Sequence, residues 1–378
     1  MADHAISTNP AVQAQLDRLW RLSPGADILG LERISVLLQR LGNPHLRLPP
    51  VFHVAGTNGK GSTCAFLRAA LEADGRKVHV YSSPHLVRFN ERIRLAGQLI
   101  DDDMLAAGLR DVLDRAEDVG ASFFEVTTAL AFLRFAEVPA DACIIEVGLG
   151  GRLDATNVIP NPVICGIAQL DIDHQAFLGT SMRAIAREKA GIAKPGVRVV
   201  TQRYLRSSAL AVRDEIAARG GICLERGTDW DIATYRGTVH YRDARGRVTL
   251  AEPTLAGKHQ VLNLGLATAM LRHQAALPVR EAALRAAPRW TQWPARLQRL
   301  DRGPLLAPLP EGSVIWLDGG HNRAAGAALA AHFRASLSGG AKITLIIGML
   351  ANKDAAGFLA PLWPMIGALH SVPVEGHA

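Results

Sequence analysis

The sequence lacks several features that would assign it to common classes of protein. No segment approaches the 18 or more consecutive apolar residues of a membrane-spanning helix. The four cysteines are scattered and form no CxxC pair, which argues against zinc and redox motifs. Aromatic residues make up only 5% of the chain, and no dense tract of lysine and arginine occurs. Nucleic-acid binding is therefore disfavoured, and the formal net charge of +7 suits anionic small molecules instead.

Two further absences bear on location and chemistry. The N-terminal stretch MADHAISTNPAVQAQ has no basic-then-apolar leader layout, so we expect a cytoplasmic protein. No Ser-His-Asp or Cys-His signature points to a catalytic nucleophile. The 378 residues exceed a typical single domain of roughly 100–200 residues, and hydrophobic residues make up 48%, so we expect two domains with full cores.

Short β-rich runs alternate with helical patterns over most of the chain. The runs VFHVAG, KVHVYS, ACIIEVG and PVICGIA are interleaved with helices expected over 61–74, 102–118 and 124–137. A further helix is expected through SMRAIAREKAGIA, with Thr180 as its cap. Strands that alternate with helices predict crossover connections and a mainly parallel sheet.

The pattern changes in the second half of the chain. Residues 229–251 alternate polar and apolar side chains with glycine at the turns, which predicts an antiparallel appendage. A long helix through KHQVLNLGLATAMLRHQAAL and a linker, APRWTQWPARLQ, follow. A second α/β pattern then runs through SVIWLDGG, a helix over 323–336, KITLIIGM, a helix over 354–363 and ALHSVPV. We place the boundary near 294, between domains 1–294 and 295–378.

The segment HVAGTNGKGST, residues 53–63, lies between an expected strand and an expected helix. Glycines there leave backbone N–H groups unobstructed and aim them, with the positive end of the helix, at an anion. Lys60 adds a point charge suited to β- and γ-phosphates, and Ser62 or Thr63 can contact a metal or phosphate. A plain glycine-rich turn is the alternative, but the lysine and the hydroxyls favour phosphate binding.

The loop departs from the usual GxxxxGK[ST] spacing, because Gly61 stands between Lys60 and Ser62. In this the sequence resembles the Mur ligase superfamily, and in particular its folylpolyglutamate synthases and dihydrofolate synthases. The peptidoglycan ligases of that superfamily usually have threonine where Gly61 stands. The further motifs follow in the family's order: YSSPHLVRFNERIR, EVGLGGRLDATNVI, LDIDHQAFLG, REKAGI, GKHQVLN, WPARLQ and LDGGHN.

This resemblance implies both a fold and an activity. The implied fold is α/β: a P-loop, mainly parallel sheet flanked by helices, followed by a smaller Rossmann-like C-terminal domain. The implied reaction is the ATP-dependent addition of L-glutamate to dihydropteroate or folates, through an acyl phosphate. Each step carries dense negative charge, so such a site needs cations and preorganised donors. ATP and Mg²⁺, as one or two ions, are the implied cofactors. We expect a monomer that binds only small molecules, without nucleic acid or membrane.

For the nucleotide, the resemblance implies one set of binding residues. They are Gly56, Thr57, Asn58, Gly59, Lys60, Gly61, Ser62, Thr63, Asn263, Arg296 and Asp318. Asn263 would bond adenine, while Arg296 and Asp318 would approach the phosphates and ribose. His321 would meet the acyl phosphate or glutamate, and with Lys60 and Lys189 it forms the expected catalytic set. Ala295, Gly320 and Arg323 stand where the family more often has glycine, alanine and proline.

The candidate metal ligands have alternatives when read from the residues alone. Glu146 ends an apolar run and so lies at a strand's carboxyl end, where α/β sites open, or else it is a surface glutamate. The resemblance places Ser83 and Glu146 at one ion and His174 at a second. From its chemistry alone His174 would be a helix-entry or packing residue, since hard cations prefer oxygen. Lys189 would ordinarily be a solvated lysine paired with Glu188, whereas the resemblance implies a CO₂-modified lysine.

For the pterin, three residues match the resembled motifs. Phe124 could stack on a flat ring, or it could be a core aromatic of its helix. Asp154 could accept hydrogen bonds from ring N–H groups. Arg88 could face the substrate's carboxylate.

The resembled proteins continue beyond SVPVEGHA with another strand–helix stretch, including a GSL turn near the glutamate site. We therefore expect a C-terminal domain that lacks its last elements, with residues after about 350 poorly packed or covered by a partner. Two other functions stay open. One is another amino-acid ligase of the superfamily, such as a muramyl-peptide ligase, and the other is a nucleotide-binding protein that has lost turnover.

Overall fold

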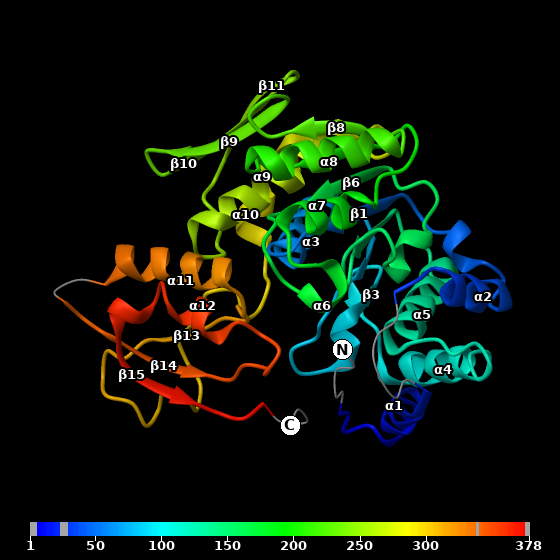
Figure 1. The fold of residues 1–378 in the computed structure, drawn as a ribbon, viewed down its shortest axis with the longest axis horizontal. Coiled ribbons are helices and arrows are strands. Elements are labelled where there is room, and N and C mark those ends of the chain that lie inside the picture. Colours follow the sequence, from blue (N-terminus) through cyan, green and yellow to red (C-terminus); the bar gives the residue numbers. More distant parts are fainter. Residues whose placement is uncertain (1–5, 23–28, 338–339, 375–378) are drawn as a thin grey trace.

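A larger and a smaller α/β body make up the molecule (Figure 1). The computed structural model describes residues 6–22, 29–337 and 340–374. The larger body holds the chain up to the yellow helices, and the smaller body holds the orange and red segments that follow. Among the described helices, none combines the length and the apolar character needed to cross a membrane.

The larger body is built on an eight-stranded sheet with the order β4-β3-β2-β5-β1-β6-β7-β8. Its strands are β1 (Val51–Ala55), β2 (Val78–Tyr81), β3 (Ile93–Leu95), β4 (Gln98–Leu99), β5 (Ala142–Glu146), β6 (Ile164–Ile167), β7 (Arg198–Thr201) and β8 (Ile222–Glu225). All neighbours pair in parallel except β2–β3 and β3–β4. The predicted mainly parallel sheet is confirmed, and the carboxyl ends of β1 and β5 lie side by side at one edge.

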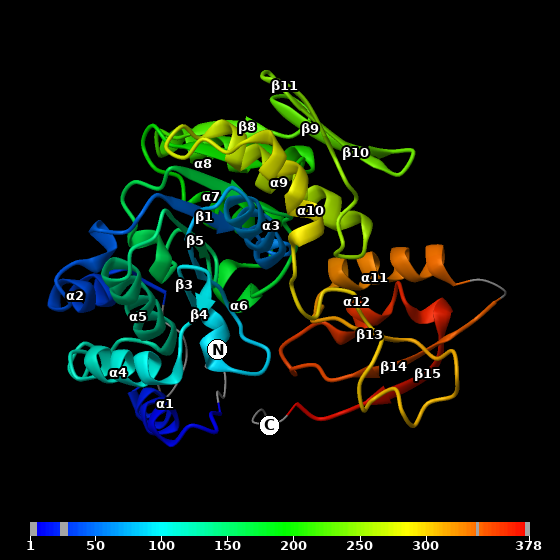
Figure 2. The ribbon, with the colours of Figure 1, turned by 180° about the vertical axis from the view of Figure 1, so that it is seen from behind.

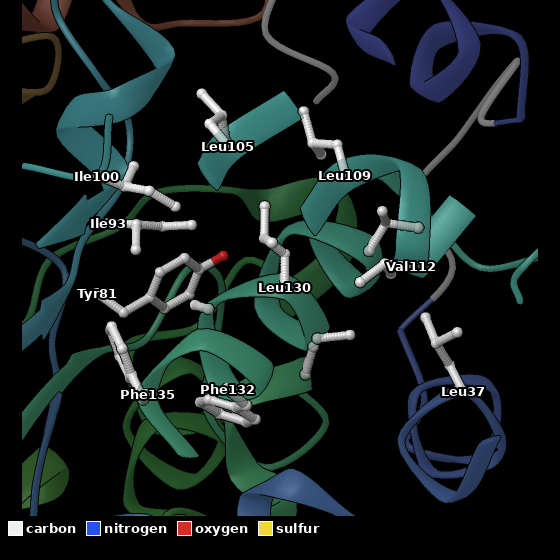
Figure 3. Close-up of a cluster of buried hydrophobic side chains, with 14 of the residues drawn as sticks. Leu37, Tyr81, Ile93, Ile100, Leu105, Leu109, Val112, Leu130, Phe132 and Phe135 are labelled. Atoms are coloured by element: carbon white, nitrogen blue, oxygen red, sulfur yellow. The ribbon is translucent and has the colours of Figure 1, made fainter. Parts of the chain in front are cut away.

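Both faces of this sheet are covered, because successive strand residues point to opposite sides. Ile145 packs into a cluster with α1 (Pro10–Leu22), α2 (Glu32–Arg40), α4 (Asp102–Leu113) and α5 (Phe123–Glu137), part of which Figure 3 shows. Its neighbour Ile144 packs on the other side, with residues of α3 (Lys60–Ala73) and α9 (Lys258–His273). Figure 2 shows α3, α9 and α10 (Glu281–Trp290) together on that face. The apolar strand runs are therefore buried on both sides.

Several predicted helix limits need correction. The cap of α7 (Met182–Ala190) is Ser181, whose Oγ accepts a hydrogen bond from the Ala184 N–H at 3.2 Å, so the assignment to Thr180 was wrong. The helix expected to reach residue 118 ends at Leu113. Part of the expected linker is helical, because α10 extends to Trp290. The remaining short helices are α6 (Gln175–Leu178), α8 (Arg206–Ala218) and the 3₁₀ turns Pro44–Leu46, Phe89–Arg92 and Ala155–Val158.

The antiparallel appendage is confirmed. It consists of β9 (Trp230–Tyr235), β10 (Thr238–Asp243) and β11 (Gly246–Leu250), in the order β11-β10-β9. The Arg272 guanidinium of α9 donates to both carboxylate oxygens of Asp243, at 2.6 and 2.7 Å. This ion pair ties the appendage to the helix that also borders the phosphate loop.

Over its described residues, the smaller body contains two two-stranded sheets and two α-helices. Strands β12 (Gln298–Leu300) and β13 (Ile315–Leu317) pair antiparallel, and β14 (Ile343–Ile347) and β15 (Ile366–Ser371) pair in parallel. Helix α11 (Arg323–Ser336) matches its predicted limits, whereas the helix expected over 354–363 is α12 (Ala355–Leu359) followed by a 3₁₀ turn, Trp363–Met365.

Packing near the end of this body differs from expectation. Phe358 and Leu362 are buried, at 3% and 1% exposure, against Leu329 and Ala330 of α11. The expected poor packing after residue 350 is therefore wrong for this part. Most side chains of β15 are exposed, and residues 375–378 lie outside the described residues.

Candidate active site

The glycine-rich loop connects β1 to α3 as predicted. Gly56 and Gly59 have φ angles of 145° and 86°, in a region where glycine is favoured. The carbonyl of Gln169, on the neighbouring strand connection, accepts from the N–H groups of Thr57 (2.8 Å) and Asn58 (3.1 Å). Helix α3 begins at Lys60, so its positive end meets the loop. The loop is thus fixed by backbone contacts at the edge where β1 and β5 end.

Two lysines converge on this loop from different elements. Lys60 Nζ donates to the carbonyl of Gly56 at 3.1 Å, and Lys189 Nζ, from α7, donates to the same oxygen at 3.0 Å. Lys189 is 4% exposed, and burial together with Lys60 lowers its pKa to about 7. The expected solvated pair with Glu188 is wrong, because Glu188 pairs with Arg152. Lys189 is a buried amine that is partly neutral near pH 7.

Glu146 is the last residue of β5 and pairs in register with Val54 of β1. The residue is 4% exposed, and its Oε2 atom is buried without a hydrogen-bond partner. Burial raises the pKa of this carboxyl group, while Lys60 and Arg296 oppose the shift. The surface alternative is therefore wrong. A buried carboxylate oxygen that lacks a donor, next to a phosphate loop, fits a hard cation.

His174 stands directly before α6, with a φ of 51°, so its helix-entry position is confirmed. Burial lowers the pKa of the ring to about 4, which leaves the imidazole neutral with a free lone pair. Among the described residues, no three His, Cys, Asp or Glu side chains gather as a metal cluster. Any ion here would have to complete its coordination with hydroxyl groups, water or the ligand.

Asp154 and Phe124 lie together on the other side of the loop. Asp154 is 2% exposed and accepts hydrogen bonds from the N–H groups of Leu149 (2.8 Å) and Thr156 (3.0 Å). The Phe124 ring covers Gly148 so closely that a Cβ added there would lie 2.3 Å from the ring. Phe123, Phe132 and Phe135 are the buried aromatics of α5, whereas Phe124 is only partly buried against the same cluster. Phe124 is left at the cavity wall.

The structure does not bring Arg88 to this cavity. Its guanidinium donates to Asp102 at 2.8 Å, and 59% of its side chain is exposed. Arg92 from the same motif lines the cavity instead, with its guanidinium over the rings of Phe89 and Phe123, 5.4 Å from each centroid. Arg92 Nε also donates to His85 Nδ1 at 3.0 Å, and a buried arginine in an irregular loop carries no periodic signal in the sequence.

The smaller body supplies its residues through turns. Asp318 follows β13, and its carboxylate accepts from the N–H groups of Leu297 and Gly320, each at 2.7 Å. Arg296 Nη1 donates to the carbonyl of Ala295 at 2.8 Å. His321 lies 3.2 Å, by its Nε2 atom, from Asp173 of the larger body.

Asp173 joins the two bodies across the cavity. Its carboxylate contacts His321 and also accepts from Lys353 Nζ at 2.6 Å, and these hydrogen bonds hold its pKa well below the usual range. The amides of Asn58 and Asn322 exchange two hydrogen bonds, at 2.9 and 3.2 Å. The start of α11 is also fixed, because the Ala324 N–H donates to Asp171 at 3.0 Å.

Of these joining residues, the sequence predicted site roles for Asn58 and His321 but not for the others. Asp171, Asp173 and Asn322 stand inside the motifs LDIDHQAFLG and LDGGHN, but only their neighbours were given roles. Lys353 belongs to no motif considered there. Their pairing depends on the closed arrangement of the two bodies, which local patterns do not encode.

Two residues from later in the chain pack on the phosphate loop. Asn263 of α9 is 4% exposed and lies so close to Gly59 that an added Cβ would meet its Oδ1 at 2.3 Å. The indole of Trp293 covers Gly61, where an added Cβ would lie 2.9 Å from the ring. The indole of Trp293 therefore leaves no room for a larger side chain at position 61.

A cavity of about 470 Å³ lies between the two bodies. Ten of the predicted residues line it: Gly56, Thr57, Lys60, Ser83, Phe124, Asp154, His174, Lys189, Asp318 and His321. The others do not line it: Asn58, Gly59, Gly61, Ser62, Thr63, Glu146, Asn263, Arg296 and Arg88. The volume is within the range of pockets for small organic ligands.

A phosphate loop at the edge of a parallel sheet, with a second body closing over it, defines a P-loop enzyme that binds its substrates between two lobes. No family model matches the sequence. The chain is 35% identical over 361 residues to the folylpolyglutamate synthase of Lacticaseibacillus casei, covering 91% of this chain and 81% of that protein. It is 36% identical over 350 residues to the dihydrofolate synthase/folylpolyglutamate synthase of Escherichia coli K12, covering 92% and 78%.

Solved structures agree with these relatives. E. coli FolC in complex with DHPP and ADP superposes with a TM-score of 0.86 at 34% identity, covering 98% of this chain and 84% of that one. A bifunctional folylpolyglutamate synthase/dihydrofolate synthase with Mn, AMPPNP and L-glutamate bound gives 0.84 at 32% identity, covering 98% and 86%. The chain belongs to the folylpolyglutamate synthase/dihydrofolate synthase family. The predicted fold class and family are confirmed. The first of these solved structures contains ADP, and the second contains AMPPNP and Mn.

Proposed function

We propose that the chain is an ATP-dependent ligase that adds L-glutamate to dihydropteroate, to folates, or to both. The observation that carries this proposal is the shared cavity, which joins the phosphate loop and Lys60 to Phe124 and Asp154. A nucleotide phosphate and a flat heterocycle could occupy its two sides at once. Residues of both bodies line the space between them, where a carboxylate would meet the γ-phosphate.

The nucleotide would bind along the loop and the start of α3. Backbone groups of residues 56–63 and the Lys60 ammonium would hold the phosphates, and Asn263 would contact the adenine. Asp318 and Arg296 would border the ribose and phosphates from the smaller body. Asn263 packs closely against Gly59, and Arg296 packs against Gly319, which supports this placement. We propose a domain boundary near 294, so that residues 1–294 hold most of the nucleotide and pterin contacts and residues 295–378 complete the site.

The residues around Glu146 fit a magnesium ion. The unpartnered Oε2 atom of Glu146 and the hydroxyl of Ser83 would hold it, and His174 would serve a second ion. Such an ion, when bound, neutralises charge on the phosphate oxygens. The absence of a cluster of three acidic or imidazole side chains among the described residues agrees with the few protein ligands that Mg²⁺ usually takes.

Lys189 is proposed to carry a carbamate. A neutral amine can attack CO₂, forming an N–C bond and releasing a proton, and the product is an anion. Because the pKa of Lys189 is lowered to about 7, this side chain is in part a neutral amine near pH 7. The modified side chain would then be a carboxylate-like group near the loop, and the repulsion with Lys60 would become an attraction.

In the proposed reaction a substrate carboxylate oxygen attacks the γ-phosphorus and ADP leaves. The glutamate amine then attacks the acyl carbon, and inorganic phosphate leaves. Lys60 would stabilise charge on the transferred phosphoryl group, and His321 would face the acyl phosphate or glutamate. Phe124 and Asp154 would hold the pterin ring by stacking and by accepted hydrogen bonds.

Phosphate release with purified protein tests this function. We expect release that requires ATP, L-glutamate and either dihydropteroate or a folate. UDP-linked muramyl substrates should give none, since a muramyl-peptide ligase is the competing enzyme. Absence of release with every pterin would favour the inactive nucleotide-binding alternative. A monomeric state and a cytoplasmic location remain predictions, which light scattering and cell fractionation would check.

A further inference from the structure

A buried hydrogen-bond chain connects the phosphate-loop strand to Asp154. His53, in the middle of β1, lies with its Nε2 atom 2.9 Å from Thr156 Oγ1. The Thr156 hydroxyl donates to Asp154 Oδ1 at 2.5 Å. His53 and Thr156 are both fully buried, and neither lines the cavity.

The direction of donation follows from the chemistry of the three groups. Burial raises the pKa of Asp154, while the hydrogen bonds from Leu149 and Thr156 oppose this shift. In its ionised form the carboxylate only accepts, so the single hydroxyl proton of Thr156 is then committed to Asp154. The Thr156 oxygen must then accept from His53, which places the imidazole proton on Nε2. This assignment leaves Nδ1 as a bare lone pair, and Nδ1 is indeed a buried atom without a partner.

A buried histidine at this position lowers the stability of the fold unless its hydrogen bond serves the site. Its strand, VFHVA, is otherwise apolar and fully buried. Burial, with a smaller contribution from Lys194, lowers the ring's pKa to about 3, so the ring is neutral and serves only as a hydrogen-bond partner. An apolar side chain would pack in the strand without an orphaned nitrogen.

We propose that Thr156 and His53 are positioning residues that fix the orientation of Asp154 as a hydrogen-bond acceptor for the N–H groups of a heterocycle in the cavity. Thr156 holds Oδ1 through its hydroxyl and its own N–H, while the Leu149 N–H holds Oδ2. Both carboxylate oxygens are therefore anchored: Oδ1 accepts two hydrogen bonds from Thr156, which leaves Oδ2 as the oxygen that would accept from the heterocycle. The inference rests on the proposed function, in which Asp154 binds the pterin.

The test compares variants by their Michaelis constants for dihydropteroate and for ATP. Thr156→Val removes the hydroxyl at nearly constant volume, and His53→Phe removes the ring donor. We expect each to raise the KM for dihydropteroate about tenfold, which corresponds to the loss of about one hydrogen bond, with the KM for ATP unchanged. Thr156→Ser and His53→Gln keep a donor at the same place and should restore most of the affinity.

His79 provides a matched control. It is also fully buried in a central strand, but its nitrogens bond the Val138 carbonyl at 2.9 Å and the Ala96 N–H at 3.0 Å, away from the cavity. His79→Phe should cost stability without changing the ratio of the two Michaelis constants. If Thr156→Val does not fold, Thr156→Ala serves in its place.

The outcomes separate this inference from the function on which it rests. If Asp154→Ala leaves dihydropteroate binding unchanged, the proposed pterin site is wrong. If Asp154→Ala weakens binding but the Thr156 and His53 variants do not, only the positioning role is wrong. A parallel rise of both Michaelis constants in the Thr156 and His53 variants would also overturn it, since that would be a general structural effect.

Discussion

Lys60 and Lys189 donate to one and the same carbonyl oxygen, that of Gly56, at 3.1 and 3.0 Å. Two ammonium groups so close to each other repel, and the repulsion is strong because Lys189 is buried. Lys60 is accordingly, after burial, the main cause of the low pKa of Lys189. The phosphate loop thus places the side chain of Lys60 beside a buried amine, Lys189, whose pKa is lowered to about 7.

Stability should depend on pH through Lys189. Its pKa falls from 10.5 to about 7 on folding, so between these values the unfolded chain binds more protons. The contribution of Lys189 to the free energy of unfolding therefore rises with pH across this window. Its destabilising effect is complete below about pH 7. We expect the wild-type melting temperature, measured in CO₂-free buffer, to rise from pH 7 to pH 9 relative to Lys189→Met. Parallel curves for the two proteins would show that Lys189 titrates normally.

The proposed carbamate on Lys189 can be observed directly. With ¹³C-labelled bicarbonate, we expect a carbamate carbon signal in the wild-type protein that grows as the amine loses its proton. The signal should be missing in Lys189→Ala and unchanged in Lys77→Ala, which removes an exposed lysine. A spectrum without the signal, in a sample that turns over, would contradict the modification.

Glu146→Gln keeps the size of the side chain but removes its charge. Turnover should fall by roughly 10²–10³, the range found when one charge-stabilising group of a preorganised site is removed. The Mg²⁺ concentration for half-maximal activity should rise as well. Glu188→Gln, which alters a carboxylate paired with Arg152, is the control and should keep the wild-type Mg²⁺ response. An unchanged Mg²⁺ dependence in Glu146→Gln would remove Glu146 from the metal site.

Gly61 should not tolerate threonine in this chain. The new Cβ would lie 2.9 Å from the Trp293 ring, and overpacking of this kind costs about 1–3 kcal/mol. Urea denaturation of Gly61→Thr should show this loss, and the double variant with Trp293→Ala should recover part of it. Equal losses in the single and double variants would mean that the indole is not the obstacle.

Elements with a strong local signal were predictable from the sequence. The loop at Gly56, the alternation of strands and helices, and α11 all follow from glycine placement and hydrophobic periodicity. The position of Glu146 followed from the end of an apolar run, since parallel strands open their sites at the carboxyl edge.

What could not be predicted depends on contacts between distant segments. Lys189 resembles a surface lysine on an amphipathic helix, and only the tertiary fold shows that it reaches Gly56. Asp173 and Lys353 are 180 residues apart in the chain and meet only because the smaller body closes over the larger one. Arg88 was given a role and Arg92 was not considered, because spacing within an irregular loop does not reveal which side chain turns inward.

Transfer of oxygen from substrate to phosphate tests the central claim most directly. Dihydropteroate labelled with ¹⁸O in its carboxylate is incubated with the protein, ATP, Mg²⁺ and L-glutamate, and the inorganic phosphate is analysed by mass spectrometry. An acyl-phosphate route moves one labelled oxygen into each phosphate released, in step with formation of the glutamyl product. Glutamyl product accompanied by unlabelled phosphate would contradict activation of the carboxylate by ATP at this site.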